Sequence, residues 1–169
     1  CLEKFKPKYF LLENNNSMPK EAKDTITEIL GVEPIMINSA LVSGQLRKRL
    51  YWTNIPGVEL PADKGIMLGD IIQSGKVDRE KSLCITRRYA GFSGSQDYFR
   101  HRYFGKSFGQ AVFEGNATAE EHKQAYKEYG KYSGVQLDGE IRQMSHVECE
   151  RLQTLPDNYT QYELIGQEV

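Results

Sequence analysis

Residues 9–38 read YFLLENNNSMPKEAKDTITEILGVEPIMIN, and this stretch sets out most of the expected fold. The apolar runs at 9–12 and 34–37 predict two short strands. Residues 19–30 predict a helix between them, because a proline suits its first turn and a glycine follows its last residue. Strand, helix and strand in this order predict a βαβ unit.

The predicted helix carries one apolar stripe, which should pack against a sheet. Short apolar strands joined by a helix are typical of a parallel sheet buried on both faces. We therefore expect a mainly parallel α/β sheet covered by this helix. The stripe consists of Ala22, Ile26, Ile29 and Leu30.

Beyond this unit, residues 50–53 predict a third strand that follows a basic run. Prolines and glycines at 56–65 suggest a boundary. From about 65 to 138 frequent glycines break the chain, so we expect an irregular region with no regular α/β alternation. Two capping boxes indicate helices within and after it, Thr118 with Glu121 and Ser145 with Glu148.

Composition narrows the class of protein. The chain has 169 residues, 39% of them hydrophobic, and a formal net charge of −1, which excludes disorder and collagen-like repeats. No apolar run approaches the roughly 18 residues of a membrane span, and the lysine-rich start does not resemble a signal peptide. We expect a cytoplasmic protein with no membrane partner. Because the chain opens on Cys1 and ends without a polar tail, we also expect that it was cut from something longer.

Cysteine and histidine usage gives no sign of a metal site. Three cysteines are an odd number at wide spacing, which indicates neither a disulfide framework nor zinc. We expect each to be buried or structural. The scattered histidines receive no catalytic role. These residues are Cys1, Cys84, Cys149, His101, His122 and His146.

Glu13 and Asn14 directly follow the first predicted strand. Ligands bind beyond the carboxyl ends of strands in open α/β sheets, so Glu13 occupies a position suited to a catalytic acid. The alternative is that both residues satisfy a strand-to-helix turn, where asparagine is favoured.

The basic segment before the third strand is a second candidate site. Gln45, Arg47 and Arg49 alternate, so they share one face if the segment is extended. Three polar side chains would then converge, and arginine suits a phosphate, a carboxylate or the carbonyl edge of a base. A solvated basic turn is the alternative.

Residues 79–106 concentrate positive charge, with seven Arg or Lys residues against two acids. Six aromatic residues and a Gly/Ser-rich segment are interleaved with them. Basic groups neutralise phosphates and flexible polar loops reach base edges, so a DNA-binding surface that includes Arg87 and Arg88 is expected. The alternative is that the aromatics form the core of a small β-rich domain whose surface the arginines solvate.

Taken in order, these segments resemble the C-terminal half of the DNA (cytosine-5) methyltransferases. The family has Glu-Asn-Val at a strand end, then Gln-x-Arg-x-Arg, then a target recognition region, then a motif with Arg, Glu, Arg-Leu-Gln and Pro-Asp-x-Tyr. The corresponding residues are Glu13, Asn14, Gln45, Arg47, Arg49, Arg142, Glu148, Arg151, Leu152, Gln153, Pro156, Asp157 and Tyr159.

The resemblance implies part of a Rossmann-like methyltransferase sheet at 1–57, an inserted, irregular, β-rich target recognition region at 58–140, and a return segment at 141–169. Its substrate would be a cytosine turned out of duplex DNA, its methyl donor S-adenosylmethionine, and no metal is needed. The setting would be bacterial or phage-type, as in restriction-modification.

The resemblance also implies residue roles. Glu13 would bind cytosine at N3 and hold the exocyclic amine, with Asn14 beside it. Arg49 would bind the cytosine carbonyl oxygen, while Arg47 and Gln45 contribute to the same site. Arg142 would contact DNA phosphate or brace the recognition region. Glu148 and Arg151 would build the hinge between the domains.

Two motifs of the family are absent from the sequence: the glycine-rich segment for the methyl donor and the Pro-Cys-Gln nucleophile loop. In the family both precede the Glu-Asn-Val strand. We therefore expect that the chain alone is inactive and that its partner is the missing N-terminal half. A non-catalytic DNA-binding or specificity subunit is the alternative function.

Overall fold

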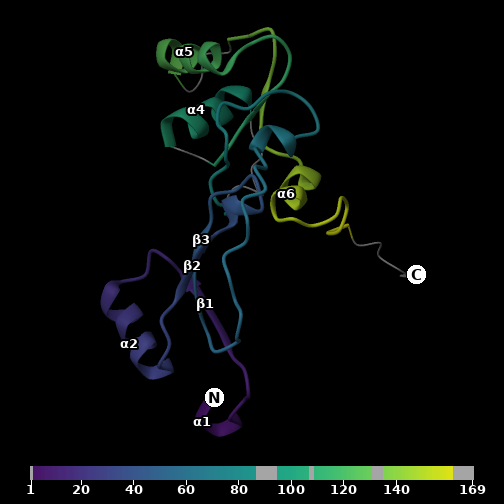
Figure 1. Cartoon of the computed structure of the whole chain (residues 1–169). Coiled ribbons are helices and arrows are strands. Elements are labelled where there is room, and N and C mark those ends of the chain that lie inside the picture. The colour runs from purple at the N-terminus through teal and green to yellow at the C-terminus, as the bar shows by residue number, and fades with distance from the viewer. Residues whose placement is uncertain (1, 87–94, 107–108, 131–134, 162–169) are drawn as a thin grey trace, which may run out of the picture.

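The computed structural model of the chain describes residues 2–86, 95–106, 109–130 and 135–161. A three-stranded sheet with α2 lies toward one end of the molecule, and α4 and α5 lie toward the other (Figure 1). The short helix α1 (Leu2–Phe5) precedes the sheet. No helix among the described residues is long and apolar enough to cross a bilayer.

The sheet has the strand order β1-β3-β2, and both outer strands run antiparallel to β3. β1 and β2 are therefore parallel to each other but not adjacent, so the prediction of a mainly parallel sheet is wrong. Only nine residues, 39–47, separate β2 from β3, fewer than the dozen or so that a parallel crossover needs. The elements are β1 (Leu11–Asn15), α2 (Lys20–Leu30), β2 (Ile35–Asn38), the 3-10 helix η1 (Ser39–Leu41) and β3 (Lys48–Thr53).

α2 confirms the predicted helix but not its burial. Pro19 is its N-cap, and Gly31 ends it with a φ of 66°, a left-handed conformation that suits glycine. Yet no residue of α2 is buried, and the predicted stripe is only partly covered: Ile26 and Leu30 are half-buried, whereas Ala22 is exposed and Ile29 is 75% exposed. One polar contact joins the helix to the sheet, from Trp52 Nε1 to Thr27 Oγ1 at 2.9 Å.

The main core lies in the second half of the chain. Its buried members come from 68–152, and the part of the predicted recognition region that is described contains two eleven-residue helices rather than a β-rich fold. The prediction of a β-rich insert is therefore wrong for the described residues. The elements are η2 (Leu68–Asp70), α4 (Gln96–Lys106), β4 (Val112–Phe113), α5 (Ala119–Tyr129), β5 (Ile141–Arg142) and α6 (His146–Leu152).

α4 explains where the aromatic residues go. Phe99 and Tyr103, one helical turn apart, are buried in the core, and Phe104 packs against it. The edge of the Tyr103 ring meets Phe113 of β4 at a centroid distance of 6.1 Å. The alternative interpretation of residues 79–106 placed their aromatic side chains in a core, and this is confirmed for Phe99, Tyr103 and Phe104.

Both predicted capping boxes are present. At α5 the Thr118 hydroxyl accepts from the Glu121 N–H, and the Glu121 carboxylate accepts from the Thr118 N–H in return. At α6 Ser145 and Glu148 make the same exchange. Local signals of this kind depend on four residues only, which is why the sequence shows them.

Two side chains, the half-buried Lys81 and the buried Ser43, tie the sheet region to the second half. Lys81 Nζ donates to the carbonyls of Ala40, Ser43 and Ile66, at 2.8, 3.2 and 2.5 Å. Ser43 Oγ donates to the carbonyl of Leu152 at 2.6 Å. The loop at 56–65 lies where the boundary was predicted, but these bonds hold the segments on either side of it together.

Candidate functional site

The two catalytic candidates from different segments meet at the sheet. Arg49 Nε lies 2.8 Å from Glu13 Oε1. The register explains this contact: Arg49 pairs with Asn15 across the strands, so Glu13 is its diagonal neighbour on the same face. The Glu13 side chain is 44% exposed and that of Arg49 18%. Glu13 is thus oriented by an arginine but is not shielded from solvent in this chain.

The strand end differs from the prediction. β1 extends to Asn15, so Glu13 and Asn14 lie within the strand rather than after it. Asn14 Oδ1 accepts from the Asn15 N–H, and Asn15 Oδ1 accepts from the Ser17 N–H. The turn alternative for Glu13 and Asn14 therefore does not hold as stated, because both lie in the strand. The side-chain contact into the turn comes from Asn15 instead.

Gln45, Arg47 and Arg49 do not share a partner. Gln45 is buried at 1% exposure, and its backbone carbonyl accepts from Ser39 Oγ. Arg47 Nη1 lies 3.3 Å from Cys84 Sγ. Arg49 pairs with Glu13, whereas the buried side-chain Nε2 of Gln45 has no hydrogen-bond partner among the described residues. The three side chains therefore do not meet at one partner in this structure.

The backbone of residues 44–47 is held from both sides. On one side Asn38 Oδ1 accepts from the Arg47 N–H at 3.1 Å. On the other, the Leu46 N–H donates to the Ser82 carbonyl and the Ser82 N–H to the Gly44 carbonyl. Neither Asn38 nor Ser82 was predicted from the sequence. The available signal was that Asn38 directly follows the strand predicted at 34–37, because asparagine is favoured in turns.

Arg87 and Arg88 lie outside the described residues. Among the neighbouring described cations, several are committed to internal contacts. Arg79 contacts Asp78 and Tyr103, and Arg100, 3% exposed, donates to Asp97 and to His122 Nδ1. Together with Lys81, these residues hold the fold rather than form an open basic surface.

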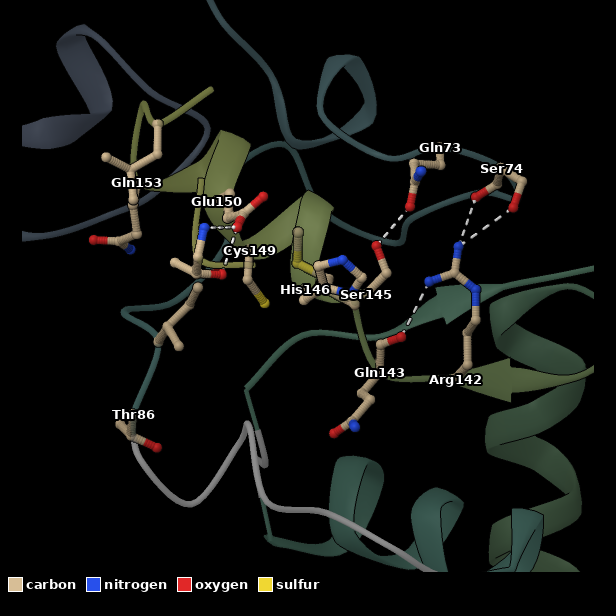
Figure 2. Close-up of a pocket in the computed structure, with 14 residues that line it drawn as sticks. Gln73, Ser74, Thr86, Arg142, Gln143, Ser145, His146, Cys149, Glu150 and Gln153 are labelled. Carbon is tan, nitrogen blue, oxygen red and sulfur yellow. Dashed lines mark hydrogen bonds between the residues drawn. The ribbon is translucent and has the colours of Figure 1, made fainter. Parts of the chain in front are cut away.

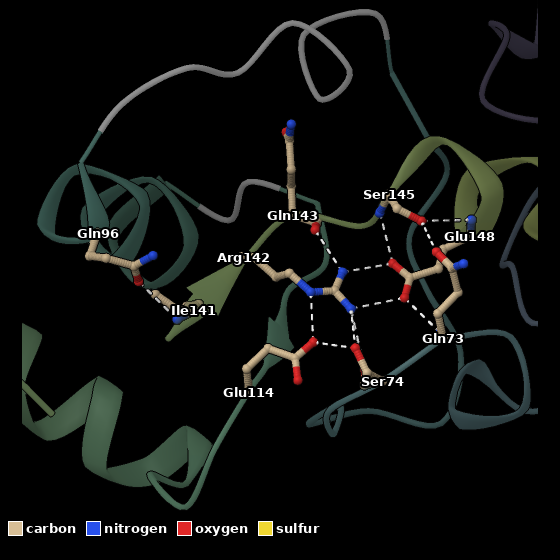
Figure 3. Close-up of polar contacts among 9 residues, drawn as sticks. All are labelled: Gln73, Ser74, Gln96, Glu114, Ile141, Arg142, Gln143, Ser145 and Glu148. Carbon is tan, nitrogen blue, oxygen red and sulfur yellow. Dashed lines mark hydrogen bonds and ion pairs between the residues drawn. The ribbon is translucent and has the colours of Figure 1, made fainter. Parts of the chain in front are cut away.

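Arg142 lies at the centre of a polar network (Figure 3). Its Nε lies 2.8 Å from Glu114 Oε1, and its Nη1 lies 2.8 Å from Glu148 Oε2. The remaining guanidinium N–H groups donate to the carbonyl of Gln143, to Glu148 Oε1 and to Ser74. With its donors engaged in this way, Arg142 fits the bracing role better than a phosphate contact.

Glu148 is the buried anion of this network, with a side chain that is fully buried. It also accepts from the backbone N–H groups of Gln73 and Ser145, both at 2.7 Å. Burial alone would raise its pKa, but the hydrogen bonds from Arg142, Gln73 and Ser145 outweigh burial and hold the pKa below its usual range. Glu148 therefore stays ionised and joins three segments of the chain.

A second brace lies at the end of α6. Glu150, 3% exposed, accepts from the N–H groups of Asn158 and Thr160, and Arg151 pairs with Asp157 at 2.6 Å. The hydrogen bonds from Thr160 and Asn158, led by that of the Thr160 hydroxyl, outweigh the effect of burial and lower the pKa of Glu150. The sequence motif around α6 thus builds a helix and a clamped turn.

A cavity of about 950 Å³ lies beside α6 (Figure 2). Cys149 faces it, and burial, with the charges of Glu148 and Glu150, raises the pKa of this thiol to about 11. Such a cysteine remains protonated at neutral pH and is a poor nucleophile. Other residues around the cavity include Thr86, Gln143, Met144, His146 and Gln153.

Comparisons with known proteins add no family. No protein-family description matches the chain, and no curated protein matches it.

Proposed function

We propose that this chain is part of a DNA (cytosine-5) methyltransferase, which transfers a methyl group to C5 of a cytosine turned out of duplex DNA. The observation that carries the proposal is the 2.8 Å ion pair between Glu13 and Arg49. The resemblance assigns these two residues to one cytosine, although 35 positions separate them in the sequence. Their contact supports a shared substrate.

In this proposal the pair recognises the edge of the base. Glu13 and cytosine N3 share a proton, while the other carboxyl oxygen accepts from the exocyclic amine. Arg49 donates to the carbonyl oxygen, and its bond to Glu13 fixes the direction of the carboxyl group. Such contacts offset the few kcal/mol that unstacking a base costs. Arg47 would contribute to the same site. Its backbone N–H donates to Asn38 Oδ1, and its guanidinium contacts Cys84 Sγ.

The methyl donor and the nucleophile are proposed to come from another polypeptide segment. S-adenosylmethionine would supply the methyl group, but we assign none of the described residues to it, because the polar groups at the strand end are already engaged. Glu13 is held by Arg49, and the side-chain oxygens of Asn14 and Asn15 accept from the backbone N–H groups of Asn15 and Ser17. The protonated thiol of Cys149 also does not fit the nucleophile.

The alternative, a non-catalytic specificity subunit, has less support. A DNA-binding module of this kind depends on cations exposed to phosphate. Arg79, Lys81 and Arg100 make internal contacts instead.

The first test is binding of deoxycytidine monophosphate to the full chain, followed by NMR. We expect shifts at Glu13 and Arg49, and a Glu13→Ala variant that binds about tenfold more weakly, a loss of about 1.4 kcal/mol. The control is Glu59→Ala, which removes an exposed carboxylate outside the site. Equal binding of thymidine monophosphate, or unchanged binding by Glu13→Ala, would contradict the proposal.

A second test concerns catalysis. The pure chain, given duplex DNA and labelled S-adenosylmethionine, should incorporate no methyl groups. Appreciable incorporation would show that the donor site and nucleophile lie within these 169 residues.

A third test addresses Arg87 and Arg88, which are proposed to contact phosphates. Removing one phosphate contact should reduce the slope of log K against log salt by about 1. Binding of duplex DNA by Arg87→Ala and Arg88→Ala should show this change, whereas Lys64→Ala, an exposed lysine in the 56–65 loop, should not. Salt-independent binding would count against the recognition region.

A further inference from the structure

Arg47 is held both at its backbone and at its side chain, by two segments that lie far apart in the sequence. Its backbone N–H donates to Asn38 Oδ1, and its backbone carbonyl accepts from the Ser39 N–H, each at 3.1 Å. Its Nη1 donates to Cys84 Sγ at 3.3 Å. The N–H, the carbonyl and the guanidinium of this half-buried arginine are therefore all engaged.

The residues just before Arg47 are held by the same two segments. Ser39 Oγ donates to the Gln45 carbonyl at 3.0 Å. The backbone N–H and carbonyl of Ser82, two residues before Cys84, both bond to the backbone of residues 44–46. The position of Arg47 thus depends on the end of β2 and on the segment that contains Cys84.

The thiol of Cys84 is oriented for its contact with the arginine. Its S–H donates to the Ile85 carbonyl at 3.7 Å, which leaves the sulfur lone pairs for the Arg47 guanidinium. A thiol is a weak donor and a weak acceptor, so this contact gives direction more than stability. Arginine has many rotamers, and fixing one of them before a ligand arrives raises the affinity.

The contact also joins two parts of the proposed DNA interface. Cys84 is separated by two residues from Arg87, which is proposed to contact phosphate. Arg47 lies two residues before Arg49, which is proposed to bind the cytosine carbonyl oxygen. Positions 37 residues apart in the sequence are brought together by one guanidinium.

We propose that Cys84 is a positioning residue for Arg47: its sulfur holds the guanidinium in one orientation at the cytosine site, while Asn38 and Ser39 hold the backbone. The site that Arg47 serves rests on the proposed function, whereas the contact itself stands on geometry. Cys84 touches neither the base nor the methyl donor in this proposal. It acts through the arginine.

The test compares variants of the full chain at two cysteines. Cys84→Val introduces an apolar side chain of similar size without the sulfur acceptor, whereas Cys84→Ser keeps an acceptor. Cys149→Val is the matched control, because Cys149 is also half-buried but faces the cavity beside α6. The first measurement is NMR relaxation of the Arg47 side-chain Nε–H group in the free chain.

In the unchanged chain this Nε–H group should be ordered. In Cys84→Val its order parameter should fall below about 0.6, a value typical of mobile groups, and Cys84→Ser should recover part of the loss. The Nε–H group of Arg49, which lies 2.8 Å from Glu13, should keep its value in every variant. Cys149→Val should change neither group.

The second measurement is the affinity for deoxycytidine monophosphate. Cys84→Val should bind it about fivefold more weakly than the unchanged chain, because Arg47 must then be ordered on binding. Cys84→Ser should recover part of this affinity, and Cys149→Val should bind as the unchanged chain does. A merely structural cysteine would lower the free energy of unfolding in both valine variants and leave the affinity alone.

A second pair of variants tests the backbone end of the same arginine. Asn38→Leu removes the acceptor of the Arg47 N–H, and Asn38→Asp keeps it. The matched control is Asn54→Leu, because Asn54 Oδ1 accepts from the Phe10 N–H at 2.9 Å beyond the other end of β3. We expect faster exchange of the Arg47 amide and weaker nucleotide binding in Asn38→Leu, but not in the other two variants.

Three results would overturn the proposal: an ordered Arg47 Nε–H group in Cys84→Val, unchanged nucleotide affinity in that variant, or an equal loss of affinity in Cys149→Val. The relaxation measurement needs no nucleotide. A chain that binds no deoxycytidine monophosphate would therefore contradict the proposed function, while relaxation still decides whether Cys84 orients Arg47.

Discussion

The sheet region, residues 2–53, and the region from 66 to 161 are held together in different ways. The second region has a core of ten buried hydrophobic residues and two buried carboxylates, Glu148 and Glu150, each clamped by several donors. The first has few buried apolar side chains and carries its candidate catalytic pair at the surface. Stability and proposed chemistry are thus placed in different parts of the chain.

The largest expected effect tests where the stability lies. Leu68→Ala removes a fully buried side chain from the core and should lower the free energy of unfolding by about 3 to 4 kcal/mol, measured by urea denaturation. Ile29→Ala, at an exposed position of α2, should change it by less than about 0.5 kcal/mol. Equal losses of unfolding free energy in the two variants would show that the two regions contribute alike to stability.

The next effect tests the buried ion pair. Arg142→Met leaves the Glu148 carboxylate buried without its cation and should cost about 3 kcal/mol in the free energy of unfolding. Arg151→Met breaks the exposed pair with Asp157 and should cost under about 1 kcal/mol. If the two variants unfold at the same urea concentration, Arg142 is not the brace of the second region.

A pH titration tests one buried group of the second region, His122, without removing any core side chain. His122 of α5 is fully buried against Arg100 of α4, and burial, together with the charge of Arg100, lowers its pKa to about 4. The unfolded chain binds a proton near pH 6.5. Stability should therefore be full above pH 6.5 and fall by about 2 to 3 kcal/mol as the pH drops to 4.

The measurement for this prediction is the urea midpoint between pH 7 and pH 4. His122→Gln, which keeps an acceptor for Arg100, should remove most of the dependence. His146→Gln, at an exposed position, should leave it. An unchanged slope in His122→Gln would assign the dependence to other groups.

The smallest expected effect on stability concerns the Glu13–Arg49 ion pair in the sheet region. Glu13→Ala removes an ion pair with a well exposed carboxylate, so it should change the free energy of unfolding by under about 0.5 kcal/mol. The same variant should bind the nucleotide about tenfold more weakly under the proposed function. A large loss of stability would make the pair structural rather than a binding site.

The sequence predicted well those features that depend on neighbours along the chain. The capping boxes at Thr118 and Ser145 and the end of α2 at Gly31 are local, and the structure has all three. The position of β3 between β1 and β2 depends on pairing between distant segments, which local patterns do not contain.

α4 shows why the recognition region was harder. Its sequence, QDYFRHRYFGK, mixes charges with aromatics and has no clear apolar stripe, because Arg100 occupies a buried position beside Phe99. The buried guanidinium is satisfied by Asp97 and by His122 from α5, a contact that the sequence does not show. The charge of Arg100 therefore suggested a surface position, whereas the structure places this side chain in the interior.

The candidate site was predicted in part. The Glu13–Arg49 contact agrees with the roles that the motifs imply, since both residues were assigned to one base. The separate partners of Gln45 and Arg47 were not predicted, because they depend on Ser39 and Cys84 from segments with no motif of their own.

The hydrogen bond from Ser43 to the carbonyl of Leu152 has a consequence for biosynthesis. It joins positions 109 residues apart and lies at the start of the segment that positions Arg47 and Arg49. Chains emerge from the ribosome from the N-terminus, and contacts of long sequence separation form late. The contacts of this segment with Asn38 and Ser82 can form while the chain is still being made, but its bond to Leu152 has to wait until α6 has been synthesised.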